Sequence, residues 1–394
     1  MPMILLHILL TFVAAVIVVS DTSILESLAI RAQRLRFFAE GSSSRGPCND
    51  THFIFISEYQ YGRSGNNLIE FTHGLWLAKH LNRTLAPPSW MNHVLEPFNT
   101  SLLESLFCYR LNADLSKPGL NVLEVTSENS FFLYKVFQDP VESPHISKSL
   151  PVLNGTMLNG PLLDDLASHF LCVYSALWSS PVDLIISSAE SIIRTHLGNE
   201  LTYSSIHKRS LEGGCSKVMA SCTTIKDYNS SELPMDAPEW KANLFVSHPI
   251  CDMTAGFANA ILAMHNRTTN RLFVAFDGHG SIDDYVSINA TIVRGAEFAN
   301  VLENFRKETK FLEMFLAIHG EFFIMNPRST FSFEVFVIRT VLNLVSVPVL
   351  KNHDFYVKNP STIDIKNPLW VTFTSIETAV HRSKHSSGKQ RKRR

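Results

Sequence analysis

The stretch HFIFISEYQYGRSGNNLIEFTHGLWLAKHL, residues 52–81, joins a compact apolar run to a glycine-containing turn and then to a segment with helical periodicity. The run that begins at His52 is typical of a buried strand. After the turn, apolar residues recur at the spacing of one helix face: Leu68, Phe71, Leu75 and Ala78. The stretch therefore predicts a strand, a turn over residues 61–67, and a helix.

The same alternation continues along the chain. A second strand starts at Arg83 and ends before Pro87. Further strand candidates cover 201–209, 243–248, 271–276, 290–295, 321–326 and 346–350, and helical patterns cover 255–265, 297–318 and 330–343. Strands that alternate with helices imply parallel sheets covered on both faces, so we expect an α/β protein. We place the boundary between two lobes, 48–195 and 196–375, near residue 195.

Composition excludes several classes of protein. The 394 residues include 35 basic and 36 acidic side chains, a balance that argues against a nucleic-acid-binding protein. Only 18% of residues are charged and 27 are Phe, which argues against disorder over most of the length. The length suits two or three domains or one large two-lobed enzyme.

The two ends of the chain are expected to lie outside the fold. Met3 to Val19 is apolar except for His7 and Thr11, which fits a cleaved signal peptide or a retained signal-anchor, with a buried helix as the third interpretation. Residues 1–20 are therefore assigned to this segment. We interpret residues 21–47 as a short stem that is helical at its start, followed by a flexible linker. The basic residues 376–394 are interpreted as a disordered, solvated tail, with contact to anionic lipid or partners as the alternative.

Glycosylation sequons and cysteines support a secretory route. Asn-x-Ser/Thr sequons begin at Asn49, Asn82, Asn99, Asn154, Asn229, Asn266 and Asn289, and Asn82 follows a helical pattern that favours its burial. The cysteines are Cys48, Cys108, Cys172, Cys215, Cys222 and Cys251. An oxidising lumen permits disulfides, and Cys215 and Cys222 are close enough to close a small loop, but the sequence does not select a connectivity. The spacings are too wide for a zinc ribbon, and we expect no metal.

Ligands of open parallel sheets sit at the carboxyl ends of strands, where the sequence offers four loops. In the first, two glycines and the following helix N-terminus suit an anion, with Arg63 and Asn66 as donors; an ordinary turn is the alternative. In the second, Arg209 follows His207 at a strand end and offers a forked phosphate contact, or both residues are structural. Glu212 is the carboxylate that lies closest to them in sequence.

The other two loops carry an acid and two hydroxyls. Asp277 closes the strand FVAF as a ligand of the site or as a turn cap. Ser329 and Thr330 suit a phosphate or simple helix capping. Upstream, Glu313 stands in an otherwise mostly apolar segment, where it could accept from guanine or face solvent.

These motifs, in this order, resemble those of the GDP-fucose protein O-fucosyltransferase family. GRSGNN and LNRTLAPPSW are similar to the first motif of the family, IHKR (206–209) to its H-x-R motif, FVAFDG to its V-A-x-D strand end, and FFIMNPRSTF to its closing motif. The resemblance covers roughly residues 50–350. Asn67 stands where the family usually has Gln. The resemblance implies a GT-B architecture, which has two Rossmann-like lobes with the sugar nucleotide in the cleft between them.

The resemblance also implies roles for single residues. Arg209 would hold the diphosphate and Glu313 would recognise guanine. The residues expected to bind GDP-fucose are Arg63, Ser64, Gly65, Asn66, His207, Lys208, Arg209, Asp277, Glu313, Ser329, Thr330 and Phe331. Arg209, Asn66 and Glu212 are expected to take part in catalysis, and strand alternation predicts that Lys208 points away from His207 and Arg209.

The implied activity is inverting, metal-independent transfer of fucose from GDP-fucose to a Ser or Thr hydroxyl of a lumenal protein, with no cofactor. A glycan acceptor is one alternative, and an inactive lumenal binding protein of the same fold is another. We expect the chain to reside in the lumen of the endoplasmic reticulum or Golgi. It would contact membrane only through its N-terminal segment, and no nucleic acid.

Overall fold

The computed structural model describes residues 23–42, 46–56, 64–125, 160–208, 255–268, 270–276, 282, 283, 285, 288, 292–294, 309–325 and 329–348. Some expectations lie outside these residues: the N-terminal segment, the strand at 243–248 and the basic tail. Within the described residues, no helix is both long and apolar enough to cross a membrane.

The first sheet is parallel and has the strand order β2-β1-β3. Strand β1 (His52–Ile56) pairs with β2 (Thr84–Ala86) and β3 (Asn121–Val125). Helix α3 (Ser64–His80) links β1 to β2. It begins earlier than expected: residues 64–67, which were assigned to the turn over 61–67, form its first helical turn. The short helices η1 (Ser89–Val94) and α4 (Ser101–Leu106) follow β2.

The second sheet has five parallel strands in the order β6-β5-β4-β7-β8. They are β4 (Ser204–Lys208), β5 (Leu272–Phe276), β6 (Ile292–Arg294), β7 (Phe322–Met325) and β8 (Val345–Pro348). Their helices are α12 (Ala255–Met264), α13 (Thr309–His319) and α14 (Thr330–Leu342). Successive strands β4, β5 and β6 lie side by side toward one edge of the sheet, and the next strand, β7, pairs with the other side of β4. The topological switch point therefore lies between β4 and β7.

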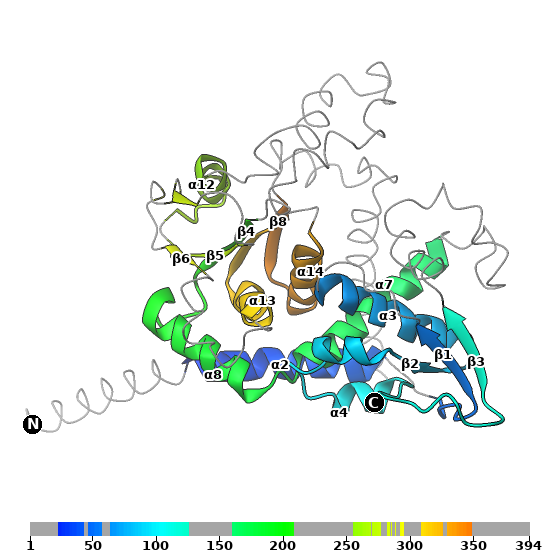
Figure 1. Cartoon of the computed structure of the whole chain (residues 1–394). Coiled ribbons are helices and arrows are strands. Elements are labelled where there is room, and N and C mark those ends of the chain that lie inside the picture. Colours follow the sequence, from blue (N-terminus) through cyan, green and yellow to red (C-terminus); the bar gives the residue numbers. More distant parts are fainter. Residues whose placement is uncertain are drawn as a thin grey trace, which may run out of the picture.

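The two sheets confirm the expected α/β class with Rossmann-like halves, and Figure 1 shows them on either side of a shared layer of helices. One apolar cluster runs from Ile54 and Phe71 beside the first sheet to Phe273 and Phe323 on one face of the second. A separate cluster, which contains Ile206 and α12, covers the opposite face of the second sheet. The boundary near residue 195 therefore does not divide two independent cores.

Two helices, α7 (Gly160–Trp178) and α8 (Asp183–Ile192), had no counterpart in the sequence interpretation, whereas α2 (Ser23–Ser42) corresponds to the helical start expected for the segment 21–47. Helix α7 packs against α2, α3, α4 and α14. Helix α8 continues into η3 (Ile193–Leu197) and packs against α13. Helix α2 runs beside α7 at the base of the molecule in Figure 1.

The interpretation of residues 21–47 as a stem is wrong for α2. Leu28, Leu35 and Ala39 are buried in the main apolar cluster. Arg31 donates to the carbonyl of His319, and Arg34 donates to the carbonyl of Leu342. These carbonyls end α13 and α14, where a guanidinium complements the helix dipole. Helix α2 is therefore an integral part of the fold.

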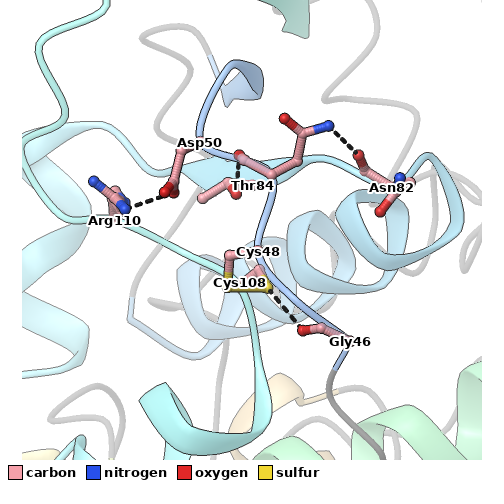
Figure 2. The surroundings of a disulfide bond; sticks show 8 residues. Gly46, Cys48, Asp50, Asn82, Thr84, Cys108 and Arg110 are labelled. Carbon is pink, nitrogen blue, oxygen red and sulfur yellow. Dashed lines mark hydrogen bonds and ion pairs between the residues drawn. A yellow bond between two sulfur atoms is a disulfide. The ribbon is translucent and has the colours of Figure 1, made fainter.

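A disulfide and its neighbours fasten the segment before β1 (Figure 2). Cys48 is bonded to Cys108, which follows α4, and an ion pair of 2.5 Å joins Asp50 to Arg110. Cys172 is buried outside any disulfide, and its Sγ donates to the carbonyl oxygen of Ala39 at 3.5 Å. The small loop suggested for Cys215 and Cys222 lies outside the described residues.

One expectation about glycosylation is wrong. Asn82 is exposed, not buried, because it follows the end of α3 with a φ of 51°. A left-handed backbone turns the chain out of the helix at that point, and Asn tolerates this conformation better than most residues.

Candidate functional site

The N-terminal turns of α3 and α14 meet at Gly65. A Cβ atom on Gly65 would lie 3.0 Å from Thr330 Oγ1 and 3.0 Å from Glu334 Oε1. The absence of a side chain therefore permits the close approach of these two helices. The first and the closing motif, which lie at opposite ends of the folded chain, are brought into contact here.

The end of β4 joins the same helix. His207 is buried, and its Nδ1 lies 2.9 Å from Ser332 Oγ in a hydrogen bond. Its ring lies against Phe331, with 4.2 Å between the centroids. Since β4 and β7 flank the switch point, the H-x-R motif and the first turn of α14 assemble where open parallel sheets bind ligands.

Lys208 points to the opposite face of the second sheet, as strand alternation predicts. Its side chain is buried, and Nζ lies 5.2 Å from the ring centroid of Tyr285. Tyr285 belongs to the apolar cluster on the α12 side of the sheet. Lys208 is thus separated from His207 by the sheet itself, so it is not retained among the residues proposed to bind GDP-fucose.

Glu313 lies near the N-terminal end of α13, the helix that leads into β7. Because this helix runs antiparallel to the strands, its N-terminal end lies at the carboxyl edge of the sheet. Glu313 keeps part of its surface exposed, and burial of the rest raises the pKa of its carboxyl to about 8. No contact that joins Glu313 to His207 or Thr330 is seen among the described residues.

Helix α14 begins at Thr330 after Ser329, which has the extended backbone of an N-cap residue. Ser329 is buried and makes no side-chain cap hydrogen bond to the helix. Thr330 and Phe331 remain partly exposed. The first backbone N–H groups of any α-helix have no acceptor within the helix, so this end of α14 suits an anionic group.

Asn67 and His93, which lie near the start of α3, were not predicted from the sequence to belong to the candidate site. Asn67 is fully buried, and its Nδ2 lies 3.5 Å from Nε2 of His93 on η1. His93 Nδ1 bonds the carbonyl oxygen of Trp90. Because a carbonyl only accepts, Nδ1 carries a proton, and Nε2 is the ring atom that faces the amide of Asn67.

Glu334 was also missed. It is fully buried in the second turn of α14, beside Gly65. Burial, opposed in part by the charge of Lys310, raises the pKa of its carboxyl well above the usual range. The signal in the sequence was an acid within FSFEVFVI, a run with no other charged residue, which predicts either an exposed stripe or a buried acid.

Several expected site residues cannot be placed in this arrangement. Arg63, Arg209, Glu212 and Asp277 lie outside the described residues. Ser64 and Asn66 are part of the first turn of α3, but their side chains are not described. Within the described part of the chain, no group of three or more His, Cys, Asp or Glu residues is placed to hold a metal ion.

Comparison with known proteins gives structural similarities only. No protein-family model matches the chain, and no curated protein matches it either. The fold is similar to that of POFUT1 in complex with GDP, with 15% identity and a TM-score of 0.46 over 77% of this chain and 99% of that chain. POFUT1 in complex with GDP-fucose gives 12% identity and a TM-score of 0.45 over 77% and 99% of the two chains. A mutant of Arabidopsis thaliana FUT1 in complex with GDP gives 11% identity and a TM-score of 0.39 over 79% and 72%.

Proposed function

We propose that this protein transfers fucose from GDP-fucose to a hydroxyl group, with a Ser or Thr side chain of a lumenal protein domain as the acceptor. One observation carries the proposal. Three motif segments that are far apart in sequence converge at one edge of the molecule, through the contacts of Gly65 with Thr330 and of His207 with Ser332. This edge holds the N-termini of two helices, which suit a diphosphate.

The reaction makes one bond and breaks one. The acceptor oxygen attacks C1 of fucose from the face opposite the diphosphate, the bond from C1 to the phosphate oxygen breaks, and the configuration inverts. GDP leaves with the electron pair of the broken bond, and the proton of the acceptor hydroxyl passes to a base, for which Glu212 is the proposed carboxylate. Negative charge grows on the diphosphate, so the helix amides, and the guanidinium of Arg209 in its proposed role, would stabilise the transition state.

The guanine end of the donor is assigned to Glu313. An ionised carboxylate accepts from N1 and N2 of guanine, so a carboxyl with a pKa of about 8 gives up its proton when the base binds. Glu313→Ala is expected to weaken GDP binding by roughly 1.5–3 kcal/mol and to relax the preference over UDP. Equal affinity of the unaltered chain for GDP and UDP would remove this assignment.

The decisive experiment is incubation of the purified chain with GDP-fucose and pools of folded domains or oligosaccharides. Transfer to a folded domain supports the protein acceptor, transfer to an oligosaccharide supports the glycan acceptor, and GDP binding without turnover supports an inactive binding protein. Arg209→Ala is expected to lower kcat about 10²–10³-fold with a smaller effect on KM, and Arg209→Lys is expected to restore little.

Lys208→Ala is the matched control for Arg209→Ala. The Lys208 side chain lies on the α12 side of the sheet against Tyr285, so turnover is expected to survive its removal. An essential Lys208 beside a dispensable Arg209 would contradict both the strand register and the assigned role.

Location in the secretory lumen is part of the proposal. Asn82, Asn99 and Asn266 of the sequons are exposed, and Cys48 and Cys108 form a disulfide, which suits an oxidising compartment. Protein from secretory cells is expected to lose mass on glycosidase treatment. An unglycosylated, purely cytosolic form would contradict it.

A further inference from the structure

Glu334 is a buried acidic side chain on α14 for which the packing of the helix gives no evident reason. It is 0% exposed, and neither carboxylate oxygen has a hydrogen-bond partner among the residues that the structure describes. An isolated buried carboxylate costs several kcal/mol, so such a group is expected to be neutral or to serve a ligand. The pKa of Glu334 is raised by burial, which favours the neutral acid.

The position of Glu334 links it to the start of both helices. Thr330 and Glu334 are one helical turn apart and therefore lie on the same face of α14. That face meets Gly65 in the first turn of α3, which brings no side chain and no charge. Glu334 thus lies one turn below the helix ends that would receive the diphosphate.

Few charged groups face Glu334 from the other packed elements. Helix α7 contributes Tyr174, whose pKa is raised first by burial and secondly by the charge of Glu334. Helix α13 contributes Lys310, whose charge acts to lower the pKa of Glu334 but is outweighed by burial. The surroundings therefore keep a proton on Glu334 while leaving the junction without a fixed negative charge.

We propose that Glu334 is a positioning residue of the donor site, which as the protonated acid packs the first turn of α14 against Gly65 without adding negative charge beneath the diphosphate. This role rests on the proposed function. At a separation on the order of 10 Å and an effective dielectric constant near 20, Coulomb repulsion between an ionised Glu334 and each unit charge of the diphosphate corresponds to a loss of affinity of roughly tenfold or more. The affinity for the donor should therefore fall toward high pH, because Glu334 ionises there.

The test measures the affinity of the full chain and of Glu334→Gln for GDP by calorimetry from about pH 6 upward, as far as both chains stay folded. Glutamine keeps the shape and neutrality of the protonated acid but cannot ionise. The dissociation constant of the unaltered chain divided by that of Glu334→Gln is expected to stay near one at low pH and to rise roughly tenfold or more at high pH. Using this ratio removes the titration of GDP itself and of Glu313, whose deprotonation favours binding as pH rises.

Glu321→Gln is the matched control, because Glu321 pairs with Arg267 at the far end of β7 and should leave the ratio flat. A second readout compares proton exchange in the two chains: at high pH, GDP binding to the unaltered chain should take up more protons than GDP binding to Glu334→Gln, as shown by different heats in buffers of different ionisation enthalpy. The comparison cancels the proton that Glu313 releases in both chains.

The outcomes separate the two levels of the proposal. A flat ratio for Glu334→Gln, together with equal proton exchange by the two chains on GDP binding, overturns the role of Glu334 and leaves the function in place. An unaltered chain that binds no GDP at any pH overturns the proposed function and the role of Glu334 with it.

Discussion

Replacing Leu35 by Ala tests whether α2 belongs to the core. Leu35 is 0% exposed within the main apolar cluster, on a helix that packs against α7 and α14. Truncation of a fully buried Leu removes its transfer free energy and leaves a cavity, so the free energy of unfolding should fall by about 3–5 kcal/mol. With a urea m-value of about 3 kcal/mol/M for a chain of this size, the unfolding midpoint should fall by about 1 M or more.

Phe37→Ala is the control on the same helix. Phe37 is larger than Leu35 but 73% exposed, so its removal should change the free energy of unfolding by less than about 0.5 kcal/mol. Circular dichroism during urea unfolding of the full chain gives both midpoints. If Leu35→Ala unfolds at the same urea concentration as Phe37→Ala, α2 is a stem after all, and the burial argument fails.

Three further predictions concern stability. Cys108→Ser opens the loop closed across a sequence separation of 60 residues and should cost about 4 kcal/mol, seen as a lower urea midpoint than for the buried thiol variant Cys172→Ser. Burial raises the pKa of Glu70 to about 8, so the folded chain holds a proton that the unfolded chain releases above about pH 4.5, and stability is lost as pH rises to about 8. Glu70→Gln should remove this loss, up to about 5 kcal/mol, and a pH slope equal to that of the unaltered chain would contradict it. Arg339 is fully buried and donates to five carbonyls between Ala317 and Val345, so Arg339→Lys, with fewer donors and no planar fork, should cost more than about 3 kcal/mol; an unchanged thermal midpoint would refute this.

Local pattern was sufficient where the core is built from consecutive residues. The apolar run at His52 became β1, the periodic residues after it became α3, and the segments at 271–276 and 330–343 became β5 and α14 almost to the residue. Strands buried on both faces and helices with one apolar face impose their periodicity on the sequence, so their identity can be read without knowing their neighbours.

The same local rule predicted the two faces of β4. Neighbouring side chains of a strand must point in opposite directions, and His207 contacts Phe331 while Lys208 lies over Tyr285. The order of the motifs also indicated a ligand edge at the carboxyl ends of the strands.

Only the tertiary structure decided what lies against what. Helix α2 carries arginines and exposed apolar residues that resemble a stem in sequence, and its burial follows from α7 and the carbonyl ends of α13 and α14, all of which are distant along the chain. The pairing of Cys48 with Cys108 likewise depends on the return of the chain past β1.

The junction of the candidate site belongs to the same class. Glycine is needed at position 65 because Thr330 and Glu334 approach its backbone closely. Glu334 is buried because α3 covers that face of α14. Sequence determines the periodicity of an element, whereas contacts between distant elements are set by how their faces pack, and a single residue carries no local signal for that choice.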